Sequence, residues 1–189
     1  DDKTKVLTLA RDRLGQKPLY YGFSENFFLF SSELKANSCT PCFEKKISKQ
    51  ALFNYFRRGY VPHPMCIFDG VYKLSPGSMV VLPLEDIHKK TLPNQIAFWD
   101  LSKVVIEGIN TRSTNLRSDN SQIRDLLTLS VQEAMVADTP VGAFLSGGID
   151  STLITAIMKN VSPTQVNTFT IGFWDRDYDE AQYAKSVAK

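Results

Sequence analysis

The chain has 189 residues, of which 43% are apolar, and this is enough for one large domain or parts of two. Its formal net charge of +2 gives no electrostatic case for binding nucleic acid or an anionic membrane, and no apolar run approaches the ~20 residues that span a bilayer. Three cysteines, an odd number, and a charged N-terminus favour reduced thiols and a cytoplasmic location.

The first third of the chain has the pattern of antiparallel β-structure. Aromatic and β-branched residues, which suit a pleated and half-buried surface, predict strands over residues 6–10, 18–23 and 27–31. A loop that contains Gly15 joins the first two strands, and a tight turn over residues 24–26 joins the last two. In the first loop, Arg11, Asp12 and Arg13 are interpreted as a charge-paired structural loop rather than as catalytic residues.

The next segment contains one helix and many turn-forming residues. Ser48 can cap a helix over residues 49–58. Residues 60–78 are rich in proline and glycine, and residues 79–82 predict another short strand.

The composition changes in the middle of the chain. Residues 109–122 are polar and predict a linker. Apolar residues then recur at helical spacing from Ile123 to Ala134, after a candidate cap at Asp119 or Ser121.

The last part of the chain alternates strands and helices. We expect strands over residues 141–145 and 166–173, and helices over residues 152–159 and 179–189. This order predicts a parallel α/β sheet, whereas the first part predicts an α+β arrangement.

A loop of glycines, serines and one aspartate lies between a predicted strand and a predicted helix. Gly147 and Gly148 let the backbone approach a phosphate closely, and the helix N-terminus favours anions. Ser146 and Ser151 add hydroxyl donors, and Asp150 makes sense beside phosphates if it holds Mg²⁺. The chain has no Walker A loop. The alternative interpretation is a flexible turn with Asp150 as a helix cap.

This loop resembles the phosphate-binding loop of N-type ATP pyrophosphatases. The surrounding residues 137–151 and 169–173 are similar to the start of the synthetase domain of glutamine-hydrolysing asparagine synthetases. The pairs Asp179–Glu180 and Tyr183–Ala184 also match the pattern of that family. Upstream, the stretches similar to the family's glutaminase domain and its tail are residues 10–21, 32–36, 71–78 and 98–101.

The resemblance implies a fold and a division into domains. Residues 1–112 would be the C-terminal portion of an Ntn-type glutaminase β-sandwich with a linker, and residues 113–189 the start of a parallel-sheet ATP pyrophosphatase domain. We therefore expect an internal fragment of a longer protein. The glutaminase nucleophile would lie upstream and the remaining synthetase groups downstream, so no complete catalytic set is expected in the chain.

The resemblance also implies an activity and its ligands. The parent enzyme, an ATP-dependent ligase, would convert aspartate, glutamine and ATP to asparagine through β-aspartyl-AMP, with release of AMP and pyrophosphate. Its cofactors would be ATP and Mg²⁺, and a homodimer is the candidate assembly. Ser146, Gly147, Gly148, Asp150 and Ser151 would bind the phosphates, with Asp150 on the metal. Leu145 and Ile171 would contact the adenosine.

Two other functions stay open. Homologous amidotransferases act on another carboxylate acceptor, such as a sugar or a polysaccharide precursor, or form cyclic amides. A chain that no longer catalyses could serve as an interaction scaffold.

Other reactive side chains have weaker patterns. Cys39 and Cys42 form a Cys-x-x-Cys pair that could act in redox chemistry or in half a zinc site, but it has no second pair. Cys66 stands alone, and His63 and His88 are interpreted as solvated loop residues.

Overall fold

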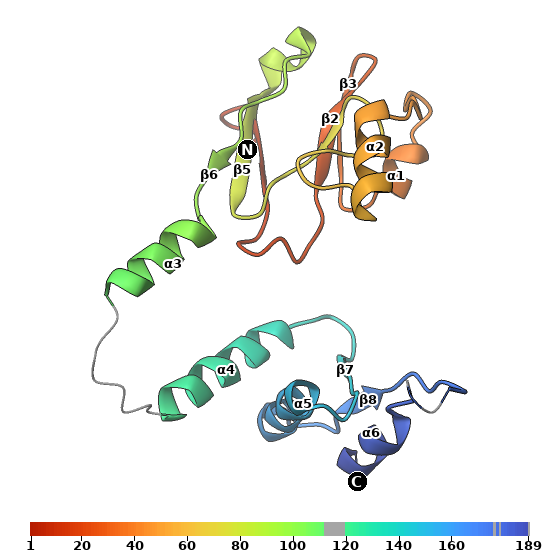
Figure 1. Ribbon diagram of the computed structural model, residues 1–189. Coiled ribbons are helices and arrows are strands. Elements are labelled where there is room, and N and C mark those ends of the chain that lie inside the picture. The colour runs from red at the N-terminus through yellow and green to blue at the C-terminus, as the bar shows by residue number, and fades with distance from the viewer. Residues whose placement is uncertain (112–119, 176, 178, 189) are drawn as a thin grey trace. The chain divides into compact units, whose positions relative to one another are not determined.

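A computed structural model describes residues 1–111, 120–175, 177 and 179–188 (Figure 1). The chain divides into two units, Asp1–Arg112 and Ser113–Lys189, and each unit is described by itself.

Unit 1 has mixed secondary structure. Its elements are β1 (Val6–Ala10), β2 (Tyr20–Ser24), β3 (Phe27–Ser31), α1 (Leu34–Ser38), α2 (Lys49–Arg58), β4 (Val71–Lys73), β5 (Ser78–Pro83), the 3-10 helix η1 (Leu84–Lys89), β6 (Ile96–Ala97) and α3 (Leu101–Asn110). The predicted strands over residues 6–10 and 27–31 and the helix over residues 49–58 are confirmed at the same bounds. The Ser48 cap is also confirmed, since its hydroxyl accepts a hydrogen bond from the backbone N–H of Ala51 at 3.3 Å.

Two small antiparallel sheets share one apolar core in unit 1. Their strand orders are β1-β5-β6 and β3-β2-β4. Leu9 of β1 and Val80 of β5 face each other in register, and they pack in one buried cluster with Tyr21 of β2 and with Leu74. A second cluster, built on Phe43, Cys66 and Val71, includes Leu34 of α1. Side chains from both sheets thus exclude water from the first cluster, which is the main source of stability in such an arrangement.

The loop after β1 is held by hydrogen bonds to backbone groups. The Arg11 guanidinium donates to the carbonyl oxygens of Gly15 and Lys17 at 2.8 Å each and to that of Leu74 at 2.7 Å. The Asp12 carboxylate accepts from the N–H groups of Gln16 and Lys17, and the bond from Lys17 is the main cause that lowers the pKa of Asp12. The structural role is confirmed, but the expected charge pairing is wrong, because no ion pair among the described residues includes Arg11, Asp12 or Arg13.

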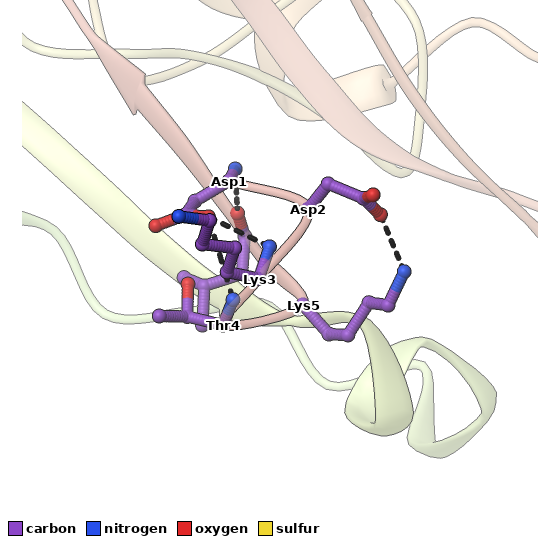
Figure 2. Close-up of polar contacts among 6 residues, drawn as sticks. Asp1, Asp2, Lys3, Thr4 and Lys5 are labelled. Atoms are coloured by element: carbon purple, nitrogen blue, oxygen red, sulfur yellow. Dashed lines mark hydrogen bonds and ion pairs between the residues drawn. The ribbon is translucent and has the colours of Figure 1, made fainter.

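The first five residues form a turn that leads into β1 (Figure 2). The Asp1 carboxylate accepts hydrogen bonds from the backbone N–H groups of Lys3 at 2.8 Å and Thr4 at 3.4 Å. Lys5 pairs with Asp2 on the exposed side of the turn. This turn places Val6 opposite Pro83, where pairing with β5 begins.

Several elements of unit 1 differ from the sequence prediction. β2 begins at Tyr20 rather than Pro18, and β4, which was not predicted, lies within the segment that is rich in turn-forming residues. The linker expected over residues 109–122 is wrong at both ends, because α3 continues to Asn110 and α4 begins at Asn120. The signal for α3 is Asp100, whose carboxylate accepts from the N–H of Lys103 at 3.1 Å and caps the helix.

Unit 2 contains α4 (Asn120–Ala134), β7 (Gly142–Phe144), α5 (Ile149–Val161), β8 (Asn167–Phe169) and α6 (Ala181–Val187). β7 and β8 are parallel, as predicted, with Ala143 opposite Thr168. Val131 of α4 packs against Ile157 and Met158 of α5 in a buried cluster. Of the two candidate caps, Asp119 lies outside the described residues and Ser121 lies inside α4.

The elements of unit 2 have the predicted order but different lengths. β7 and β8 are each three residues long, since their pairing stops at Phe144 opposite Phe169. Helix α5 begins at Ile149, three residues earlier than predicted, so the end of the glycine loop belongs to its first turn. No helix among the described residues is long and apolar enough to cross a membrane.

We predict that Gly22→Ala destabilises unit 1 far more than Gly59→Ala does. A Cβ at Gly22 would lie 2.1 Å from the carbonyl oxygen of Gly70, the residue that precedes β4. This atom belongs to the backbone, so it cannot move away without disturbing the pairing of β2 with β4. We expect a loss of about 2–3 kcal/mol in the free energy of unfolding. Gly59 has φ of +77° but open space around it, so alanine there should cost about 1 kcal/mol. Urea unfolding followed by circular dichroism measures both, and the reverse order would contradict the packing of β2 against β4.

We predict that Cys66 resists alkylation in the folded chain. Its side chain is buried, and desolvation raises the pKa of the Cys66 thiol, so less reactive thiolate is present at a given pH. Cys39 is exposed. Iodoacetamide at pH 8 should label Cys39 at least ~10-fold faster than Cys66, as measured by peptide mass spectrometry. Equal rates in the native chain, with urea-unfolded chain as the control, would show that Cys66 is accessible.

Candidate functional site

The glycine loop begins where β7 ends, and its first residue is anchored on the sheet. Leu145 is 2% exposed, and its N–H donates to the carbonyl oxygen of Phe169 at 2.9 Å. The Thr170 hydroxyl donates to the carbonyl oxygen of Leu145 at 2.6 Å. Both backbone groups of Leu145 are therefore satisfied by the chain around β8, and the loop starts from a fixed point.

Two serine hydroxyls close the loop. The hydroxyl oxygens of Ser146 and Ser151 lie 2.8 Å apart in a hydrogen bond. Ser151 Oγ also accepts from the N–H of Ser146 at 3.3 Å, and Ser146 Oγ accepts from the N–H of Gly148 at 3.3 Å. The hydroxyl groups of both serines thus stabilise the shape of the loop.

The two glycines have different structural reasons to lack a side chain. Gly147 has φ of +84°, and a Cβ there would lie 2.6 Å from Tyr183 Cβ and 2.8 Å from the backbone nitrogen of Ala184. Gly148 has an ordinary φ of −71°, and a Cβ there would meet only Ser146 Oγ, at 3.4 Å. The fold itself therefore requires glycine at Gly147, whereas at Gly148 it leaves space on the loop surface.

The loop ends in the first turn of α5. Gly148 is the N-cap residue, and its carbonyl oxygen accepts from the N–H of Thr152 at 3.0 Å. The N–H groups of Ile149, Asp150 and Ser151 have no carbonyl partner within the helix, as in every helix N-terminus. The 13 residues of α5 add a dipole whose positive end lies at the loop. This end favours an anionic group.

A pocket of about 460 Å³ lies beside the loop. It is lined by Ser146, Gly147, Gly148, Asp177, Asp179, Glu180 and Tyr183. The three carboxylates among these residues make the pocket unfavourable for a free polyphosphate. A divalent cation that bridges carboxylate and phosphate oxygens would remove this repulsion.

The residues expected at the site are only partly brought together. Ser146, Gly147 and Gly148 line the pocket, and Ser151 supports it through its bond to Ser146. Asp150 is exposed in the first turn of α5 and is not among the lining residues.

The two residues expected at the adenosine have unlike surroundings. Ile171 is 67% exposed on the chain that leaves β8. Leu145 is almost fully buried, so it offers little surface.

The sequence analysis missed the acidic wall as a part of the site. In the sequence, Asp179, Glu180 and Tyr183 stand out only through their match to a family pattern, and Asp177 does not stand out. The available signal was the group of acidic residues that follows the second parallel strand, from Asp175 to Glu180. Within the described ranges, no three His, Cys, Asp or Glu side chains form a group that could hold a metal ion. Asp150 could therefore supply only one part of a Mg²⁺ shell, with phosphate and water oxygens as the rest.

The cysteines of unit 1 do not form a comparable site. Cys39, Cys42 and Cys66 are all free thiols, with Cys39 exposed and Cys66 buried.

Comparison with protein families matches two segments of the chain. Residues 1–92 match the glutamine amidotransferase domain family, and residues 122–189 match the asparagine synthase family.

Curated relatives align along nearly the whole chain. A putative asparagine synthetase [glutamine-hydrolyzing] 2 of Methanocaldococcus jannaschii is 35% identical over 99% of the chain. Asparagine synthetase [glutamine-hydrolyzing] 1 of Bacillus subtilis is 35% identical over 97% of the chain. A putative asparagine synthetase [glutamine-hydrolyzing] of Mycobacterium tuberculosis is 32% identical over the full chain. The chain spans 35%, 27% and 28% of the length of these relatives, respectively.

An amidotransferase segment is thus followed by an asparagine synthase segment. The alignments with the relatives named above cover both segments. The chain belongs to the family of glutamine-hydrolysing asparagine synthetases.

Proposed function

We propose that the chain carries the phosphate-binding loop of a glutamine-dependent asparagine synthetase. The parent enzyme would make asparagine from aspartate, glutamine and ATP through β-aspartyl-AMP, with release of AMP and pyrophosphate. The single observation that carries this proposal is the closed loop over Ser146–Ser151, which joins a parallel strand to the N-terminus of α5.

The proposal includes a finer description of the fold. Residues 1–112 would be the C-terminal portion of an Ntn-type glutaminase β-sandwich, and two antiparallel sheets that share a core support this. Residues 113–189 would be the start of an ATP pyrophosphatase domain, supported by parallel β7 and β8 with α5 between them.

The chemistry requires an activated carboxylate. Attack of the aspartate side chain on the α-phosphate of ATP would give an acyl-adenylate and pyrophosphate, and ammonia from glutamine would then displace AMP. Loop N–H groups and the dipole of α5 would stabilise the charge that develops on pyrophosphate. Mg²⁺, when bound, would neutralise phosphate charge beside the carboxylates.

Each predicted residue has a part in this proposal. Gly148 would let the β- and γ-phosphates approach the backbone, Ser146 and Ser151 would hold the loop, and Asp150 would bind Mg²⁺. Ile171 is exposed enough to contact the adenosine. Leu145 would contact the adenosine only through the small part of its surface that is exposed. Aspartate, glutamine and ATP as substrates, the candidate homodimer and the cytoplasmic location remain predictions.

We predict that Gly148→Ala and Gly147→Ala fail in different ways. Gly148→Ala should leave folding intact, because its Cβ has space, yet weaken ATP binding at least ~10-fold by blocking the approach of phosphate. Gly147→Ala should lower stability by about 2–4 kcal/mol, since its Cβ meets α6 and its φ is positive. Fluorescent-ATP titration and thermal unfolding of both variants separate the effects. Unchanged ATP affinity in the folded Gly148→Ala variant would show that the loop is not part of the ATP-binding site.

We predict that the full natural polypeptide carrying this sequence catalyses ATP–pyrophosphate exchange only when aspartate is present. Asp150→Ala should reduce exchange by ~100-fold or more, because a lost metal ligand removes transition-state stabilisation of several kcal/mol. Asp138→Ala is a matched control, since Asp138 is an exposed carboxylate ahead of β7 and outside the pocket.

The other outcomes assign other functions. ATP–pyrophosphate exchange that does not depend on aspartate but requires another carboxylate substrate would favour a related amidotransferase. ATP affinity without exchange for any acceptor would favour the scaffold.

A further inference from the structure

We propose that Asp179 is a positioning residue that holds α6 against the phosphate-binding loop and is not a metal ligand. This inference rests on the proposed function, because it assigns a role beside the ATP loop. Asp179 is one of three carboxylates that line the pocket, and its contacts differ from those of the other two.

One oxygen of Asp179 joins two segments of the backbone. Asp179 Oδ1 accepts hydrogen bonds from the N–H of Phe173 at 3.3 Å and from the N–H of Ala181 at 3.2 Å. Phe173 lies on the chain that leaves β8, and Ala181 is the first residue of α6. The carboxylate is half-buried there and ties the end of the strand region to the start of the helix.

Helix α6 in turn packs directly on the loop. Ala184 is 2% exposed, and its backbone nitrogen lies 2.8 Å from the position that a Cβ of Gly147 would take. The N–H groups of Tyr183 and Ala184 both donate to the carbonyl oxygen of Glu180, at 3.1 Å each, so the residue after Asp179 sets the first turn of α6. Tyr183 also lines the pocket.

The contacts form a continuous path from Asp179 to the loop. A shift at the start of α6 moves Tyr183 and Ala184 relative to Gly147, and Gly147 lies between Ser146 and Gly148, which are joined by a hydrogen bond. Since backbone atoms meet at this point, the loop cannot keep its shape while α6 moves. Asp179 therefore acts on the ATP site through α6.

The hydrogen-bond acceptor, not the negative charge, is what this role needs. Asparagine at this position keeps the acceptor oxygen and removes the charge, whereas alanine removes both. Asp177 is the matched control, because it lines the same pocket and its carboxylate has no hydrogen bond to another described residue.

The first experiment compares Asp179→Asn, Asp179→Ala and Asp177→Ala in the full natural polypeptide by ATP–pyrophosphate exchange. Asp179→Ala should raise the KM for ATP about tenfold, equivalent to ~1.4 kcal/mol, with a smaller change in kcat. Asp179→Asn should stay within about twofold of the unaltered protein in KM and in the Mg²⁺ concentration required. If Asp179→Asn instead raises the Mg²⁺ concentration that exchange requires, Asp179 is a metal ligand and the proposal is overturned.

The second experiment needs no nucleotide. Amide hydrogen exchange of the ligand-free protein should show faster exchange at Phe173, Ala181, Ser146 and Gly148 in Asp179→Ala, with near-normal rates in Asp179→Asn and Asp177→Ala. Unchanged amides in β7 and β8 would show that the variant is folded. If exchange at Ser146 and Gly148 does not respond in folded Asp179→Ala, the path through α6 is refuted.

The two experiments separate this inference from the proposed function. An unaltered protein that neither binds ATP nor catalyses exchange would refute the proposed function, while hydrogen exchange would still decide whether Asp179 positions the loop.

Discussion

The close approach of α6 to Gly147 is the constraint on which the candidate site depends. A Cβ at this residue would lie within 2.8 Å of atoms of Tyr183 and Ala184, and the positive φ of Gly147 turns the chain toward α5. Because neither contact tolerates a side chain, loop, helix and pocket wall can exist together only with glycine at this position. Packing against α6 therefore requires glycine in this loop, in addition to the phosphate-binding role that we propose for the loop.

Electrostatics places a second demand on the same pocket. The N-terminus of α5 favours an anion, but Asp177, Asp179 and Glu180 repel one. A nucleotide bound together with a divalent cation would satisfy both, because the charge of the cation would offset that of the carboxylates while the helix N-terminus favours the phosphates. In the function that we propose, these opposed charges would favour a metal-bound nucleotide over a free polyanion.

In both units, charged side chains form hydrogen bonds with backbone groups of loops. Arg11 donates to three carbonyl oxygens, and Asp12 and Asp179 each accept two backbone N–H groups. In each case a charged side chain replaces the regular hydrogen bonds that a loop lacks. From the sequence alone, such charged residues suggest ion pairs. Only the fold shows that their hydrogen-bond partners are backbone groups.

The sequence by itself determined the order of elements in unit 2 and the location of the loop, because strand and helix periodicities and the glycine–serine pattern are local properties. It also determined β1, β3 and α2, whose strand propensities or cap residue lie within the segment. Tertiary structure decided where β7 and β8 end, since pairing needs a partner, and it revealed α3, whose C-terminal end extends into the expected linker. It alone showed that Gly147 is required by α6, that Leu145 is buried, and that Asp179 contacts Phe173 and Ala181. These facts depend on residues far apart in the chain or on the direction of single side chains, which no local pattern encodes.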